Sequence, residues 1–206
     1  FDITYLSTLP NFVVMAASDE SELVKMISTS VDINDRPSAF RYPRGNGTGV
    51  ELPDIKEILK IGEGKIITQG KHIAILNFGA RLNECKKALE VLEKKGITTT
   101  IFDARFAKPL DEKAIIELAS SHEVILTIEE GSIGGFGSHV SKLLSERGFF
   151  DKGLKFRSMF LPDKFLDQDT PEKMYKSAGL DYETMVQKIE STLNSNIVIA
   201  KNKNLS

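Results

Sequence analysis

The sequence has little of what a disulfide scaffold, a metal centre or a membrane span requires. Its 206 residues include one cysteine, Cys85, and three histidines, His72, His122 and His139. One cysteine excludes an internal disulfide and every cysteine-cluster metal site, and the three histidines are too scattered to give a metal-ligand spacing. No window approaches the roughly 18 consecutive apolar residues of a transmembrane helix, so we expect no membrane partner.

The sequence also lacks an excess of charge of either sign. Lys and Arg number 27 against 29 Asp and Glu, for a formal net charge of −2, and the basic residues are dispersed. Nucleic-acid binding requires a basic patch or stripe, so we expect no nucleic-acid partner. With 41% hydrophobic and 27% charged residues, the chain has ample material for a globular core. Cys85 falls on an apolar helical face, which predicts a buried, inert thiol and fits a reducing compartment.

The first 54 residues predict the end of a domain. The chain begins without an initiator methionine or a basic leader, and we expect it to be a fragment that starts inside a folded unit. The apolar run 12–16 predicts a buried strand, and Asp19 with Glu22 has the spacing of a capping box at the start of a helix. A strand at 38–42 then completes a β-α-β unit. One such unit is too small to fold alone, so we expect residues 1–54 to end a larger domain.

The remaining chain alternates strands with helices. Residues 46–70 are rich in glycine and charge, with short structured pieces at 55–59 and 65–68, and we place an interdomain linker at 55–70. From 71 to 194, apolar runs of strand length alternate with segments of helical periodicity, which predicts a three-layer α/β/α domain with a parallel-rich mixed sheet. The predicted strands are 72–78, 98–102, 123–128 and 155–161. Residues 195–206 are expected to form a polar tail.

The best candidate for a substrate contact lies just after the strand predicted at 38–42. Pro43 ends that strand, because it removes a ladder donor, so Arg44 is expected at the strand's carboxyl edge. Ligands bind at this edge in open α/β sheets, and a guanidinium followed by Gly45 offers a phosphate or carboxylate charge-assisted donors with close backbone approach. A surface ion pair is the alternative interpretation for a loop arginine.

A second glycine-rich segment, 129–138, joins a predicted strand to a predicted helix. Its amides are candidates for an anion site at a helix N-terminus. The segment lacks the Lys-Ser/Thr of a Walker motif and departs from the dinucleotide fingerprint, so we favour close packing over ligand binding. Glu129 and Glu130 are neighbours on an extended chain and point to opposite faces, which makes them a poor acid/base pair.

Several separated motifs together give a family resemblance. They occur in the order and spacing of the 1-deoxy-D-xylulose-5-phosphate synthases, which are thiamine-diphosphate enzymes of the transketolase superfamily, and the resemblance extends to about residue 193. The motifs are Phe1-Asp-Ile-Thr-Tyr-Leu6, Pro37-Ser-Ala-Phe-Arg-Tyr-Pro-Arg-Gly45, Asp103-Ala-Arg-Phe-Ala-Lys-Pro-Leu-Asp111, Glu129-Glu-Gly-Ser-Ile-Gly-Gly-Phe-Gly-Ser138, Leu161-Pro-Asp-Lys-Phe165 and Ala178-Gly-Leu-Asp181.

The resemblance implies both a fold and a reaction. Residues 1–54 would end the pyrimidine-binding domain and 71–194 would be the transketolase C-terminal domain. The family condenses pyruvate with glyceraldehyde 3-phosphate, releasing CO2, in isoprenoid biosynthesis and in the supply of thiamine and pyridoxal precursors. Its members use thiamine diphosphate and Mg²⁺, whose ligands would lie outside this chain. We therefore expect no catalytic, cofactor or metal residue here, and a fragment that is inactive alone.

The resemblance also implies a substrate residue and an assembly. Arg44 would hold the phosphate of glyceraldehyde 3-phosphate, with Arg41 and Tyr42 as support. A homodimer is implied, in the bacterial cytoplasm or in a plastid. Two alternatives stay open: the C-terminal part of another thiamine-diphosphate enzyme, such as a transketolase or a 2-oxoacid dehydrogenase β subunit, or a non-catalytic dimerisation module.

Overall fold

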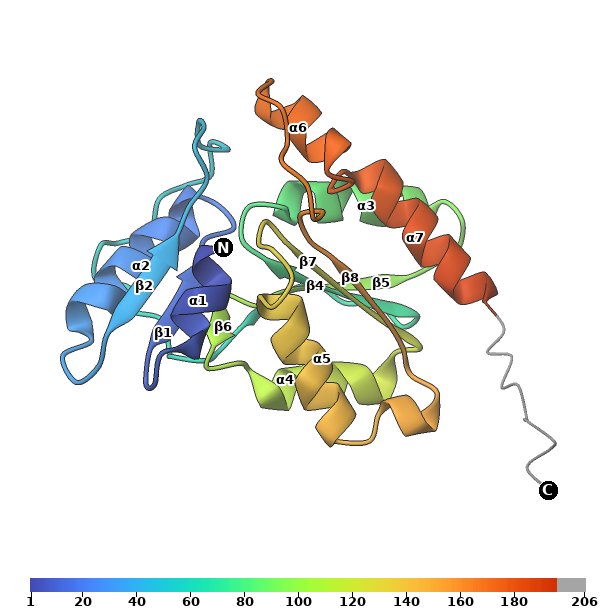
Figure 1. Ribbon diagram of the computed structural model, residues 1–206, viewed down its shortest axis with the longest axis horizontal. Helices are drawn as coiled ribbons and strands as arrows, with labels where there is room; N and C mark the ends of the chain where they lie inside the picture. The colour runs from blue at the N-terminus through green and yellow to red at the C-terminus, as the bar shows by residue number, and fades with distance from the viewer. Residues whose placement is uncertain (196–206) are drawn as a thin grey trace.

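The computed structural model describes residues 1–195 and contains two sheets joined side by side (Figure 1). The first sheet has three strands in the order β2-β1-β6, and the second has five in the order β3-β5-β4-β7-β8. The strands are β1 (Val13–Ala16), β2 (Ser38–Arg41), β3 (Lys65–Thr68), β4 (Ile73–Phe78), β5 (Thr99–Asp103), β6 (Phe106–Lys108), β7 (Val124–Glu129) and β8 (Lys155–Met159). The helices are α1 (Asp2–Thr8), α2 (Glu20–Asp32), α3 (Leu82–Glu93), α4 (Glu112–Ser121), α5 (Phe136–Glu146), α6 (Pro171–Ser177) and α7 (Tyr182–Asn194), with a 3-10 turn at Phe150–Lys152.

The predicted β-α-β unit is confirmed. All of β1 is buried, as its unbroken apolar run requires, and β1 pairs in parallel with β2 across the intervening α2. Two elements were missed by sequence reasoning. Helix α1 precedes the unit, and β6, a three-residue strand from the middle of the chain, pairs antiparallel with β1. Strand β5 belongs to the second sheet and β6, which follows it directly, belongs to the first, so the chain passes from one sheet to the other at this point.

The second sheet confirms the predicted three-layer α/β/α architecture. Strands β5, β4, β7 and β8 are parallel, and β3 adds an antiparallel edge. Helices α3 and α7 pack on one face, and α4 and α5 pack on the other (Figure 1). Strands β4 and β7 are buried throughout because they lie at the centre of the sheet with helices on both sides. Cys85 is buried in the α3 layer, as predicted.

Helix starts follow the capping chemistry that the sequence contains. Asp19, Asp111, Thr170 and Asp181 each accept a hydrogen bond from a backbone amide in the first turn of the helix that follows. The capping box predicted for α2 is only half formed. The carboxylate of Glu22 pairs with Arg105, which lies in the connection between β5 and β6, and this tertiary ion pair replaces the local bond back to the helix start.

The segment expected to be a linker, 55–70, is anchored at both ends. Leu59 is buried against the first sheet, and its amide donates to Thr29 Oγ1 at 2.8 Å. Strand β3 then belongs to the five-stranded sheet. The expected polar tail, 195–206, lies outside the described residues from 196 onward. Within residues 1–195, no helix combines the length and the apolar character needed to cross a membrane.

Candidate functional site

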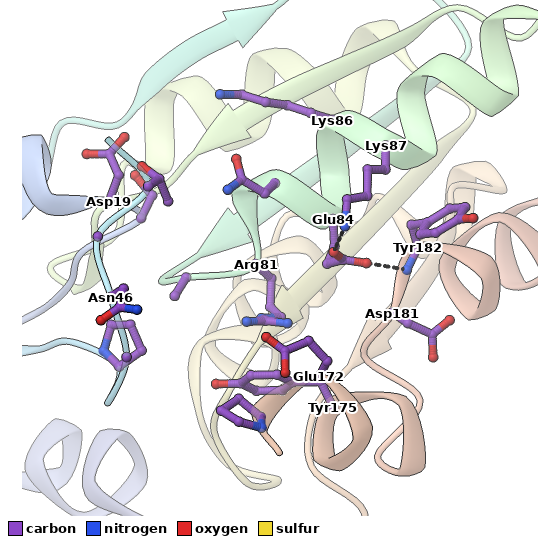
Figure 2. Close-up of a pocket in the computed structure, with 18 of the residues that line it drawn as sticks. Asp19, Asn46, Arg81, Glu84, Lys86, Lys87, Glu172, Tyr175, Asp181 and Tyr182 are labelled. Atoms are coloured by element: carbon purple, nitrogen blue, oxygen red, sulfur yellow. Dashed lines mark hydrogen bonds and ion pairs between the residues drawn. The ribbon is translucent and has the colours of Figure 1, made fainter. Parts of the chain in front are cut away.

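An open cleft of about 1220 Å³ lies between the two sheets (Figure 2). Its first wall is the start of α2 and the loop 42–48 that follows β2, and its second wall is formed by α3, α6 and the start of α7. Both walls stand at the carboxyl ends of parallel strands, β2 in the first sheet and β4 in the second. This is the place where open α/β sheets bind ligands.

The structure places Arg44 in the first wall of this cleft. The residue is exposed and follows β2 by three positions, as the strand-ending Pro43 predicted. Among residues 1–195, Arg44 makes no ion pair and no hydrogen bond, so the surface ion pair considered as its alternative role is not formed there. A Cβ placed on the neighbouring Gly45 would meet nothing within 4 Å, so space is open beside the guanidinium-bearing residue.

Arg41 and Tyr42 lie in two different environments. Arg41 Nη1 donates to the carbonyl oxygen of Glu130 at 2.8 Å, and its Nε lies 3.4 Å from Asp2 Oδ2. It therefore ties the first sheet to the loop after β7. Tyr42 lines the cleft, remains 61% exposed and stacks on Phe40 with 6.4 Å between ring centroids. The structure thus brings Tyr42 beside Arg44 and directs Arg41 away from the cleft.

The glycine-rich loop after Arg44 surrounds a carboxylate. The amides of Thr48, Gly49 and Val50 donate to the Glu20 carboxylate at 2.8, 2.5 and 3.1 Å, and Thr48 Oγ1 adds a fourth bond at 3.0 Å. Glu20 is the first residue of α2, and bonds from the amides of Thr48, of Glu20 itself and of Gly49 lower the pKa of its carboxyl to about 2. A Cβ on Gly47 would lie 2.8 Å from Glu20 Oε1, so a side chain there would displace the carboxylate from its present position.

The second glycine-rich loop, between β7 and α5, also surrounds a carboxylate. Glu129 accepts from the amides of Phe136 and Gly137 at 3.0 and 2.8 Å, which satisfies the N-terminus of α5 from within the chain. A Cβ at Gly135 would overlap this carboxylate. The amides considered for an anion are therefore occupied, and the close-packing interpretation is confirmed. Burial raises the pKa of Glu129 and outweighs the lowering by its two amide bonds.

Sequence reasoning missed an arginine in the second wall. Arg81 ends the turn after β4, and its guanidinium carbon lies 3.4 Å from the centroid of the Tyr175 ring in α6 (Figure 2). Its Nε is 3.2 Å from Oε1 of the buried Glu130. Burial, followed by the charge of Glu130, raises the pKa of Tyr175 to about 12. The signal available in the sequence was an arginine two residues after Gly79, the glycine that follows β4, at the same sheet edge as Glu130.

A buried polar cluster, also missed, joins the two sheets beneath the cleft. Ser18 Oγ donates to Asp103 Oδ2 at 2.6 Å, and Arg105 Nη2 donates to Glu22 Oε1 at 2.7 Å. Arg105 adopts the left-handed region at φ 58°, which is uncommon for a residue with a side chain. Burial raises the pKa of Asp103 to about 7, and the bond from Ser18 only partly opposes that rise. An aspartate and an arginine directly after a strand were the available signal.

The cleft holds no ready metal centre in the described part of the chain. Among residues 1–195, no group of three or more His, Cys, Asp or Glu side chains is arranged to hold a metal ion. The carboxylates of the two glycine-rich loops are already bound to backbone amides. We therefore assign no metal ligand among residues 1–195.

The chain belongs to the family described as transketolase, C-terminal domain, whose profile matches residues 62–185. Three solved structures resemble it. A split-gene transketolase described as an inactive β4 tetramer has 24% identity and a TM-score of 0.80, covering 93% of this chain and 61% of its own. A transketolase from Campylobacter jejuni subsp. jejuni has 18% identity and a TM-score of 0.65, covering 91% and 27%. A transketolase variant from Pichia stipitis has 18% identity and a TM-score of 0.69, covering 92% and 26%.

These similarities define the fold and the domain family. At 18–24% identity the solved structures speak to the fold alone. The matched family supports a parent protein of the thiamine-diphosphate type. The chain spans 61% of the first of these structures and about a quarter of the other two, so activity, substrates and assembly belong to a proposal about a larger protein.

Proposed function

We propose that this chain is the C-terminal part of a 1-deoxy-D-xylulose-5-phosphate synthase. The complete enzyme would condense pyruvate with glyceraldehyde 3-phosphate and release CO2, with thiamine diphosphate and Mg²⁺ held by other parts of the protein. The proposal rests on the separated motifs of the sequence together with membership of the transketolase C-terminal domain family. A homodimer is part of the same proposal.

The observation that carries the proposal is the position of Arg44. It lines the cleft at the carboxyl end of β2, is exposed, and makes no ion pair or hydrogen bond within the described residues. The cleft has room for a small phosphorylated substrate. A guanidinium binds a phosphate through charge-assisted hydrogen bonds, each contributing on the order of 1.5–3 kcal/mol. In this proposal Arg44 holds the phosphate of glyceraldehyde 3-phosphate, Tyr42 borders the site, and Arg41 supports it through its contact with Glu130.

The test is steady-state kinetics of the complete enzyme with the two substrates varied separately. For Arg44→Ala we expect the KM for glyceraldehyde 3-phosphate to rise about tenfold or more, equivalent to about 1.4 kcal/mol, with the KM for pyruvate nearly unchanged. Arg44→Lys keeps the positive charge but loses the planar guanidinium, so its KM for glyceraldehyde 3-phosphate should lie between the values for wild type and for Arg44→Ala. An equal effect on both substrates, or none on either, would show that Arg44 does not clamp the phosphate.

Two control variants separate the clamp from loss of charge and from loss of support. Arg36→Ala removes a cation at the opposite end of β2, where Arg36 pairs with Asp35, and should leave both KM values within about twofold of wild type. Arg41→Ala breaks a contact between the sheets, so it should lower stability and affect both substrates together.

Transketolase activity is the second candidate, because the three structures compared above are transketolases. The donor substrate distinguishes the two activities. Release of CO2 from pyruvate in the presence of glyceraldehyde 3-phosphate supports the synthase, whereas transfer of a two-carbon unit from a ketose phosphate without CO2 supports a transketolase.

A further inference from the structure

The loop that carries Arg44 has almost no packing of its own. Residues 42–50 are all exposed, and β2 ends at Arg41. An exposed loop without buried apolar contacts opens at little cost in free energy, so something else must define its conformation. Within the described residues, the tether at the far end of this loop is the set of hydrogen bonds to Glu20.

The tether is specific in its geometry. Both carboxylate oxygens are used: Oε2 accepts from the amide and the hydroxyl of Thr48, and Oε1 accepts from the amides of Gly49 and Val50. Gly49 has φ +82°, a conformation that L side chains rarely adopt and that turns successive amides toward one point. Gly47 leaves the space that the carboxylate fills.

Glu20 is also fixed at its other end. As the first residue of α2 it follows the cap Asp19, and an anionic carboxylate is favoured at a helix N-terminus. The carboxylate therefore connects a rigid helix to the loop that bears Arg44. Because it fills the ring of amides, no second anion can bind those amides while it is in place. A phosphate that enters the cleft beside this loop meets the Arg44 side chain.

We propose that Glu20 is a positioning residue, whose carboxylate holds residues 45–50 in the conformation that presents Arg44 to the phosphate of the acceptor substrate. This inference rests on the proposed function of Arg44. It adds a requirement that the motif alone does not contain: recognition of the phosphate needs an acid at the start of α2 as well as the arginine after β2.

The experiment compares Glu20→Gln with a matched control in the complete enzyme. Gln preserves the size of the side chain but replaces one acceptor oxygen by an NH2 donor facing the loop amides. Glu51→Gln removes the same charge from the same loop region, where Glu51 is exposed and makes no hydrogen bond or ion pair among residues 1–195. Two quantities are measured for each variant and for Arg44→Ala: amide hydrogen exchange of residues 45–50, and the separate KM values for the two substrates.

For Glu20→Gln we expect exchange in residues 45–50 to quicken about tenfold and the KM for glyceraldehyde 3-phosphate to rise several-fold, with kcat and the pyruvate KM nearly unchanged. Glu51→Gln should leave both quantities as in wild type. Arg44→Ala should raise the same KM without altering loop exchange. In the Arg44→Ala background, Glu20→Gln should raise the KM for glyceraldehyde 3-phosphate little further, because both substitutions act on the same contact between Arg44 and the phosphate.

The possible failures are distinguishable. Unchanged exchange in Glu20→Gln overturns the inference, since Glu20 then does not order the loop. Faster exchange with an unchanged acceptor KM also overturns it, provided that Arg44→Ala raises that KM. If Arg44→Ala leaves the acceptor KM unchanged, the proposed function fails first and the role of Glu20 falls with it. A general loss of kcat with both KM values raised marks Glu20 as merely structural.

Discussion

Two glycine-rich loops of this protein each bind a glutamate carboxylate, one at the surface and one in the core. Each follows a parallel strand, β2 or β7, and each wraps a glutamate carboxylate with backbone amides. Glu20 is solvent-accessible and its pKa falls to about 2, whereas Glu129 is 2% exposed and its pKa rises. Similar hydrogen bonds thus accompany pKa shifts of opposite sign. Amide donors stabilise the charged form in both loops, and the desolvation of Glu129 outweighs them.

The comparison also separates two reasons for a glycine. In the second loop Gly135 makes room for a carboxylate that cannot move, because the core of the five-stranded sheet surrounds it. In the first loop Gly47 makes room for a carboxylate that can swing into solvent. A Cβ on Gly45 would meet nothing within 4 Å. A glycine-rich sequence therefore does not by itself distinguish a loop built for packing from a loop built for a ligand.

The largest expected effect comes from adding one methyl group to the second loop, at Gly135, and the same change in the first loop, at Gly47, is its comparison. Gly135→Ala pushes its Cβ into Glu129, and moving that carboxylate leaves the amides of Phe136 and Gly137 buried without partners. We expect the free energy of unfolding to fall by about 3 kcal/mol. Gly47→Ala should cost under about 1 kcal/mol, because its clash is with the movable end of Glu20. Urea unfolding followed by circular dichroism measures both.

Gly45→Ala is the matched control for steric effects, and we expect it to change stability by less than about 0.5 kcal/mol. The double variant Glu129→Ala/Gly135→Ala tests the mechanism: once Glu129→Ala has removed the carboxylate, and with it the partner of the Phe136 and Gly137 amides, adding Gly135→Ala should cause little further loss of stability. Equal losses of stability in Gly135→Ala and Gly47→Ala would contradict the contrast between a fixed and a movable carboxylate.

A third carboxylate extends the comparison to complete burial. Asp103 is 1% exposed and lies near Ser18, Glu22, Arg105 and the Cys85 thiol, and among residues 1–195 its carboxylate accepts one hydrogen bond from a side chain, that of Ser18. Its pKa of about 7 lies above the ordinary 3.8 because burial disfavours the charged form. Between pH 3.8 and about 7 the unfolded chain has lost this proton while the folded chain keeps it, so stability falls as pH rises through this window.

Asp103→Asn should remove that slope, because an amide does not ionise. The bond from Ser18 can persist to the amide oxygen. Relative to wild type, we expect the variant to gain on the order of 2 kcal/mol of stability between pH 5 and pH 8. Urea unfolding of both proteins across this range measures the difference. A difference that does not change with pH would show that Asp103 does not titrate in the folded protein between these values.

The sequence predicted the architecture well because the responsible signals are local. Apolar runs of strand length marked the strands that became β1, β4 and β7, and the side chain of Asp19 marked a helix start that the structure confirms. Strand β6 was missed because its three residues carry no periodicity and its partner, β1, lies some ninety residues earlier in the chain. Pairing over that separation is decided by tertiary packing.

The candidate site was predicted only in part for the same reason. The position of Arg44 followed from Pro43 and the end of β2, which are neighbours in sequence. The partners of the other functional groups lie far away in sequence: Arg81 meets Tyr175 within the second wall of the cleft, and the Glu20 carboxylate meets amides 28 to 30 residues later. Spacing rules cover contacts within a helix or a turn, so they are silent about these pairs.

The smallest expected effect concerns the first glycine-rich loop, whose glutamate, Glu20, is the solvent-accessible one of the two. The pKa of Glu20 lies near 2 instead of 4.5, so the bonded carboxylate should hold the loop above about pH 4.5 and release it as the pH falls through about 2. NMR chemical shifts of the amides of Thr48, Gly49 and Val50 should move together with this midpoint, and those of Phe136 should follow a higher one, because Glu129 has a raised pKa. Glu20→Gln should abolish the first transition and leave the second. A common midpoint near 4.5 for both loops would mean that neither burial nor the amide bonds shift these carboxylates, and the contrast between the loops would fail.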